Sequence, residues 1–184
     1  MELTTNELVR TTLESCLDSQ EVIGLHTTPE ELDRLSVGFL IALHEDCCLF
    51  QTFDEVGDRD SVLLCTYDRL LRISLGGPYL QAFASRIKVD SCLPSPNLTP
   101  SNLQEALAWS LAEGRIISVF EEAGGVSSGS VVSYDDEALR LSVYSAAAEY
   151  SGDEILFLGS IVSIAMDGRR ERFIEELLRA EESD

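Results

Sequence analysis

The sequence predicts a mainly β (α+β) protein built from two tandem small antiparallel β-barrels, each with flanking helices. Three observations support this fold class. Short apolar runs alternate with turn residues, helical patterns flank each group of runs, and the second half repeats the apolar pattern of the first after ninety-one residues. The chain is accordingly divided into a first barrel with its helices over 1–91, a proline-rich linker over 92–101, and a second barrel with its helices over 102–184.

The first segment opens with a predicted helix over residues 5–18. Thr4 and Glu7 fit a capping box, in which each side chain bonds the backbone N–H of the other residue. Leu13 and Leu17 follow at a spacing of four and lie on one helical face. Strands are then predicted over 21–26, 38–43, 47–53, 62–66 and 70–75, and a second helical stripe comprises Leu80, Phe83, Ala84 and Ile87.

The second segment repeats this order. Thr99 is the predicted N-cap of its first helix, with Pro100 at the first helical position, where the missing N–H costs nothing. Gly114 ends that helix. Strands are predicted over 115–120, 129–134, 138–144, 155–158 and 161–166, and a final helix over 169–182.

The repeat aligns glycines and strand faces. Gly38 corresponds to Gly129 and Ile73 to Ile164, and the period-2 faces agree in both halves. A slip of one residue would place each apolar set on the opposite face. Five short strands in about sixty residues cannot cover both faces of an open sheet, so each half is predicted to close into a strongly bent barrel without exposed edges.

These motifs resemble those of the Sm-like (Lsm-like) proteins. The runs GSVVSYDDEALRL (129–141) and LFLGSIVSI (156–164) contain a glycine opening the second strand, an acidic turn, and an apolar-Gly-x-apolar turn. The tandem order is also similar to that of uncharacterised bacterial proteins with two such barrels. In the first half, Thr66-Tyr67 replaces Gly159-Ser160. RNA-binding members carry a basic residue before that glycine, where this chain has Leu158, with Cys65 assigned to the matching place in the first half.

The charge balance argues against nucleic acid and membrane surfaces. The formal net charge is −20, from 16 acids and 7 bases in residues 1–92 and from 17 and 6 in residues 93–184. Such a field repels phosphate backbones and anionic lipids. No apolar run approaches the ~20 residues of a membrane span, and the first ten residues lack the order of a signal peptide. We therefore expect a cytoplasmic protein.

No residue is predicted to be catalytic, cofactor-binding or metal-binding. His26 and His44 lack ligand residues at metal-binding spacing, and Cys47-Cys48 would point to opposite sides of a strand. The small residues of 124–130 lack the lysine of a phosphate loop and lead into a strand. Paired acids at predicted turns are typical of turn chemistry. The five cysteines, odd in number, suggest no disulfide framework.

We therefore expect a binding or interaction module that is not an enzyme and has no cofactor. Its expected partner is a protein, basic if charge complementarity governs the choice, and a homo-oligomer is left open. One alternative is an acidic immunity-type inhibitor of a basic nuclease toxin. A second is an RNA-associated Sm-like protein, which would need a basic patch that thirteen bases among thirty-three acids do not predict.

Overall fold

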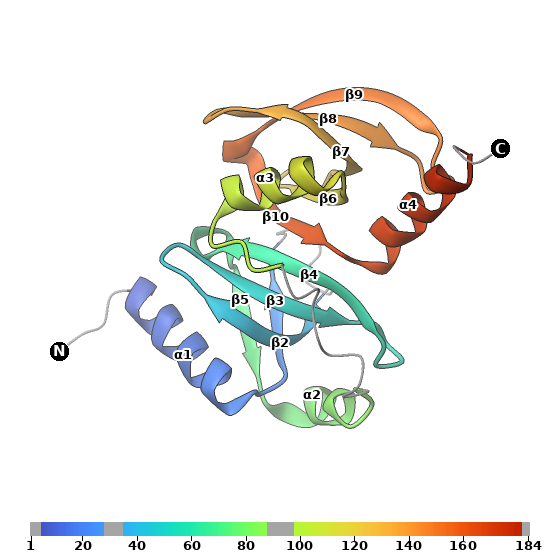
Figure 1. Ribbon diagram of the computed structural model, residues 1–184. Helices are drawn as coiled ribbons and strands as arrows, with labels where there is room; N and C mark the ends of the chain where they lie inside the picture. Colours follow the sequence, from blue (N-terminus) through green and yellow to red (C-terminus); the bar gives the residue numbers. More distant parts are fainter. Residues whose placement is uncertain (1–4, 28–34, 88–97, 182–184) are drawn as a thin grey trace.

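The computed structural model describes residues 5–27, 35–87 and 98–181 (Figure 1). The first half contains α1 (Thr5–Ser19), β1 (Ile23–His26), β2 (Ser36–Leu43), β3 (Cys47–Phe53), β4 (Arg59–Thr66), the 3-10 turn η2 (Tyr67–Arg69), β5 (Arg72–Leu75) and α2 (Gly77–Ala84). The second half contains α3 (Leu103–Glu113), β6 (Ile116–Glu121), β7 (Val126–Tyr134), β8 (Ala138–Tyr144), β9 (Tyr150–Phe157), η4 (Leu158–Ser160), β10 (Ile161–Met166) and α4 (Arg169–Glu181).

One antiparallel sheet of ten strands runs through both halves, in the order β5-β1-β2-β3-β4-β10-β6-β7-β8-β9. The halves stack with β4 and β10 side by side between them (Figure 1). The predicted closure into two separate barrels is therefore wrong, because the outer edge of β4 pairs with β10 of the other half. Among the described residues, β5 and β9 have one partner strand each and end the sheet.

The β2–β3 and β3–β4 ladders coincide with the β7–β8 and β8–β9 ladders when 91 is added to the residue numbers of the first half, whereas β1 corresponds to β6 with an offset of 94. Cys48 pairs with Cys65 as Leu139 pairs with Leu156, and Gly38 pairs with Thr52 as Gly129 pairs with Val143. Both second-to-third strand ladders shift register at the same place, between Leu40 and Ala42 and between Val131 and Ser133. The turns η2 and η4 are also related by 91.

Equivalent glycines are required in the second strand of each half, Gly38 in β2 and Gly129 in β7. A Cβ on Gly38 would collide with the backbone oxygen of Gln51, and a Cβ on Gly129 with that of Ser142. Both residues therefore lie where the neighbouring strand approaches too closely for any side chain.

Several predicted elements agree with the structure. β3, β8 and β10 have the predicted bounds, and α1 covers residues 5–19 against the predicted 5–18. β9 begins at Tyr150, five residues earlier than predicted. The capping residue Thr4 and most of the linker over 92–101 lie outside the described residues.

Helix α3 starts later than predicted. Its N-cap is Asn102, whose Oδ1 accepts a hydrogen bond from the backbone N–H of Glu105 at 2.9 Å. The carboxylate of Glu105 reaches back to the N–H of Ser101 at 2.8 Å. These two bonds satisfy donors at the helix start, so an asparagine three residues beyond Thr99 is the cap. Gly114 ends the helix in the left-handed region at φ 62°, as predicted.

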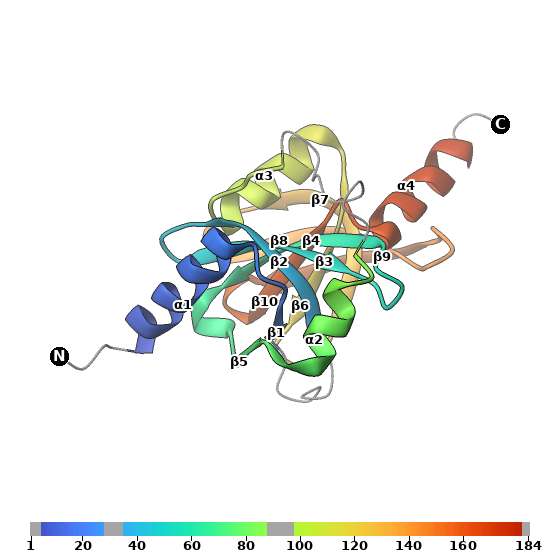
Figure 2. The same ribbon diagram turned by 90° about the horizontal axis from the view of Figure 1, so that it is seen from below.

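The largest core cluster combines both halves. Val62 and Leu64 of β4 pack with Ile164 and Met166 of β10 and with Leu107 of α3. A second cluster lies beneath α1 in the first half, where Leu13 and Cys16 pack on the sheet. Figure 2 shows α1 and α3 over neighbouring parts of the sheet, which is seen there from below. The sheet and the main core therefore join the two halves into one packed unit.

Within the described ranges, no helix is both long enough and apolar enough to cross a membrane.

Candidate functional site

The junction between the halves is a four-pair ladder. Cα partners are Cys65 with Ser163, Leu64 with Ile164, Leu63 with Ala165, and Val62 with Met166. Every residue of β10 is buried, because core lies on one face of the strand and the packing beneath α1 extends to the other. Period-2 alternation along a strand predicts one covered face, so burial of Ser163 together with its neighbour Ile164 does not follow from the sequence pattern.

Ion pairs lie at one end of this ladder. Asp167, only 5% exposed, accepts hydrogen bonds from Arg59 at 2.7 Å and from Arg115 at 3.2 Å. Asp167 directly follows β10, and its backbone is in the left-handed region at φ 50°. Since Arg59 belongs to β4 and Asp167 follows β10, this ion pair ties the halves together.

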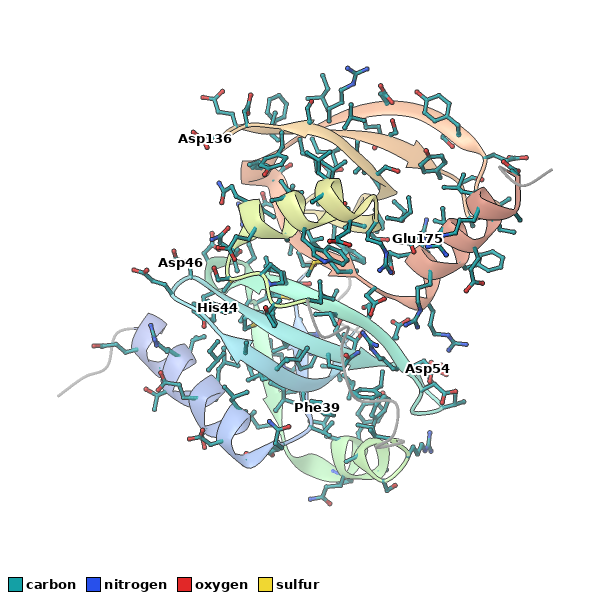
Figure 3. The ribbon with its side chains drawn as sticks, viewed as in Figure 1. Phe39, His44, Asp46, Asp54, Asp136 and Glu175 are labelled. Atoms are coloured by element: carbon teal, nitrogen blue, oxygen red, sulfur yellow. The ribbon has the colours of Figure 1, made fainter. Side chains whose placement is uncertain are left out.

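A second buried carboxylate completes the network. Glu175 of α4 accepts from Arg115 Nε at 2.7 Å and from the N–H of Ile116 at 3.0 Å, where α4 faces the start of β6 (Figure 3). Burial alone would lower the pKa of Arg115, but the hydrogen bonds and charges of Glu175 and Asp167 outweigh burial and raise that pKa. Paired in this way, the buried charges are compensated.

A groove runs along the junction on the opposite face of β10 from the main core. Three adjoining hollows, the largest of about 430 Å³, share Asp60 and Phe120 in their walls. Leu25 and Leu63 add apolar surface, and Gly124 borders the same hollow from the β6–β7 turn. The groove therefore combines an apolar floor with two carboxylates, Asp60 and Glu171, that are not part of the Arg115 network.

Two carboxylates of this groove have pKa values raised above the ordinary range. Burial raises the pKa of Asp60 and of Glu171, which line one hollow together. Glu171 also accepts a hydrogen bond from the Ser118 hydroxyl, which is 2.7 Å from that of Ser128. Such groups can hold a proton or bind a hydrogen-bond donor. Neither histidine is among the described residues that line these hollows, so we assign no acid–base pair here.

The outer strand β9 presents large apolar side chains to solvent. Tyr150, Ile155 and Phe157 are 62%, 68% and 67% exposed. Beside them, Asp153 accepts hydrogen bonds from Arg140 Nε at 3.0 Å and from the Tyr150 hydroxyl at 2.9 Å. Because β9 is a terminal strand of the described sheet, its outer backbone groups are open to pairing.

The other terminal strand, β5, is also apolar. Leu75, and Leu71 just before the strand, are each 49% exposed. Its charged residue is basic, Arg72, whereas β9 carries Asp153 and Glu154. Figure 1 shows β9 at the top of the molecule and β5 in the lower half. The two open edges thus have opposite charge and lie apart.

The cysteines that were considered as possible functional residues are buried in the described core. Cys16, Cys47, Cys48 and Cys65 are buried free cysteines, and Cys92 lies outside the described residues. Burial raises the pKa of Cys47 to about 11 and that of Cys65 to about 12, which disfavours the reactive thiolate. No group of three or more potential metal ligands occurs in the part of the chain that the structure describes.

The acidic turn at Asp135 behaves as turn chemistry predicts. Asp135 accepts hydrogen bonds from the N–H groups of Glu137 and Ala138, each at 2.8 Å. Asp136 lies at the outer end of the same hairpin (Figure 3). The residues of 126–130 belong to β7, while Gly124 and Gly125 form the turn before it.

One correspondence within the repeat needs correction. The ladder registers place Cys65 with Leu156, and the matching 3-10 turns place Tyr67 with Leu158. Tyr67, rather than Cys65, therefore corresponds to Leu158. This is the position at which RNA-binding Sm-like proteins carry a basic residue. Neither half has a base there.

The buried charges were missed from sequence, although α4 carries a signal for them. Glu171 and Glu175 are spaced by four residues and flank Ile174, so all three share one helical face. Acids that share the buried face of a helix indicate a polar network beneath it.

No protein-family model, no curated protein and no solved structure matches this chain.

Proposed function

We propose that this protein is a binding module for other proteins, without catalysis of its own, and that the outer edge of β9 is its binding surface. The observation that carries the proposal is the exposure of Ile155 and Phe157 on a terminal strand. An edge strand binds a partner strand through backbone hydrogen bonds, and its side chains select the partner. Large exposed apolar groups beside such an edge mark an interaction site.

The proposal includes the evolutionary origin of the two halves. We infer that they are repeats of one unit, supported by the common offset of 91 in their ladders and turns. We also propose that this repeated unit is similar to the Sm-like proteins.

The charge of the edge indicates the chemistry of the partner strand. β9 carries Asp153 and Glu154 and no base. A partner strand with apolar residues and at least one arginine or lysine fits this edge. Among the described residues, eight arginines form ion pairs with carboxylates, which opposes a nucleic-acid partner.

Photo-crosslinking tests this function. A photoreactive benzoylphenylalanine replaces Phe157, and a matched variant carries it at Tyr79, which is 60% exposed on α2. After illumination of an extract of the producing cells, we expect a protein adduct at position 157 and none at position 79.

Three other outcomes bear on the proposal. RNA attached at position 157 would favour the RNA-associated alternative, and a basic nuclease attached there would favour the immunity-type inhibitor. No adduct at 157, or equal adducts at both positions, would refute the proposed surface.

A further inference from the structure

We propose that the groove along the junction is a binding site for a small organic cation, a molecule with an apolar body and one protonated amine. The inference goes beyond the proposed function of β9, since no residue of β9 is among the described residues that line the groove. Its basis is a carboxylate without a partner, which lies in the groove beside an aromatic ring and apolar side chains.

Both halves of the chain form this groove. Asp60 and Leu63 belong to β4, whereas Phe120 belongs to β6 and Val126 begins β7. β10 lies between β4 and β6 in the sheet, and its Ser163 is part of the wall. The site therefore exists only in the joined structure, in which the ladder between β4 and β10 holds the halves together.

The largest hollow has the size and the lining of a small-molecule site. Its volume of about 430 Å³ lies within the range of roughly 300–1,000 Å³ that is typical of such sites. Leu25, Leu63 and Val126 supply its apolar wall. Hollows of about 190 and 230 Å³ adjoin it and are lined in part by Thr52 and by Glu171. The apolar body of a ligand therefore fits in the largest hollow.

Asp60 is the acid that all three hollows share. Its side chain is partly buried, and the described residues offer its carboxylate neither a hydrogen bond nor an ion pair. Burial raises the pKa of Asp60, which reflects the cost of holding this charge away from water. A ligand that donates a charged hydrogen bond to Asp60 would offset that cost.

Two arginines of α4 act on Asp60 only at longer range. Arg169 forms an ion pair with Asp54, and Arg172 lies 3.9 Å from Asp167. Both arginines oppose the effect of burial on the pKa of Asp60, but neither forms an ion pair with it. The carboxylate of Asp60 therefore stays open to a ligand.

The ligand charge that fits this groove is positive. Phe120 lines all three hollows together with Asp60, and the face of an aromatic ring attracts a cation as a carboxylate does. In the hollow that Asp60 shares with Glu171, Arg170 supplies one positive charge against two carboxylates. A ligand carboxylate would be repelled by both acids, so an amine is favoured over an amino acid.

Three probes with the same apolar body test the charge of the ligand. Phenethylamine is a cation, phenethyl alcohol is its neutral analogue, and free phenylalanine is the same amine with a carboxylate added. Each is titrated at neutral pH into the isotope-labelled chain, and NMR shifts of the backbone amides give both the affinity and the location. We expect the amine to bind about tenfold or more tighter than the other two, because it alone adds a charged hydrogen bond without repulsion. The shifted amides should be those of β4, β6 and β10.

A matched pair of variants tests the role of Asp60. Asp60→Asn removes the carboxylate in the groove, and Asp136→Asn removes one at the outer end of a hairpin (Figure 3). We expect Asp60→Asn to weaken the binding of phenethylamine about tenfold or more, and Asp136→Asn to leave its affinity unchanged. Because the carboxylate of Asp60 lacks a partner, Asp60→Asn should melt no lower than the wild type.

Phe120→Leu provides a second test that does not remove a charge. It keeps an apolar side chain but lacks the aromatic ring, so it should weaken the binding of phenethylamine about threefold or more and that of phenethyl alcohol less.

The inference is overturned if phenethylamine does not shift the amides of the groove, if the alcohol or phenylalanine binds as tightly, or if Asp60→Asn keeps the wild-type affinity. None of these results touches the crosslink expected at position 157, so the proposed function and this inference fail separately.

Discussion

Leu64 and Ile155 occupy the same position of the two halves, so truncating each to alanine measures what the junction contributes. Leu64 is buried against β10, and removing its side chain leaves a cavity in the main core. Leu→Ala changes at such sites cost about 2–5 kcal/mol of unfolding free energy. Ile155 is exposed, so Ile155→Ala should cost about 0.5 kcal/mol or less.

The magnitudes translate into separable melting temperatures. For a chain of this size, each kcal/mol lowers the melting temperature by about 2–4 °C, so Leu64→Ala should melt about 4–20 °C lower than the wild type. Urea unfolding gives the free energies.

A double-mutant cycle then shows whether the loss arises at the junction. Ile164→Val, directly opposite Leu64, should cost about 0.5–1.5 kcal/mol alone, and its coupling to Leu64→Ala should be at least about 0.5 kcal/mol. If Leu64→Ala melts like Ile155→Ala, or if the two core changes add without coupling, the packing of β4 on β10 is refuted.

Three further predictions concern the buried carboxylate of Glu171, the glycines Gly38 and Gly129, and the binding of RNA. Burial raises the pKa of Glu171 in the folded state, so the folded chain binds more protons than the unfolded chain just above the ordinary value of 4.5, and its stability falls as pH rises there. In urea unfolding measured over a series of pH values above 4.5, Glu171→Gln should show a shallower fall of stability than the wild type. Gly38→Ala and Gly129→Ala should each lower the unfolding free energy by about 1–3 kcal/mol or more, measured by urea unfolding, because the added methyl group of each would meet a backbone oxygen. A neutral effect at either position would contradict the close approach of the neighbouring strand. In gel shifts with single-stranded RNA at low salt, we expect no binding tighter than about micromolar, and tighter binding that weakens with salt would contradict this.

Local sequence patterns predicted where the strands begin and end, but they did not predict which strands pair with each other. The bounds of β3, β8 and β10 follow from apolar runs between turn residues, which are properties of the neighbouring sequence. Which strand pairs with the outer edge of β4 is a matter of long-range contact. The closed barrels were predicted because no local pattern states that β10, one hundred residues further along, takes that edge.

The burial of several polar residues was also not predicted from the sequence. Alternation along β10 predicts one solvated face, which would include Ser163, whereas both faces of the strand are covered. Asp167 and Glu175 were not singled out, because acids are usually exposed unless a partner such as Arg115 is brought to them by the fold. The helix start was misplaced since Thr99 and Asn102 are both suitable caps.

The position of β10 in the middle of the sheet has a consequence for synthesis of the chain on the ribosome. β4 is made about one hundred residues before β10, so during that interval Leu64 and its neighbours have no covering strand. At about 5–20 residues per second, a nascent chain exposes this apolar edge for roughly five to twenty seconds. A chaperone that shields β4 would thus act on the first half alone, and would be displaced when residues 161–166 emerge and insert between β4 and β6.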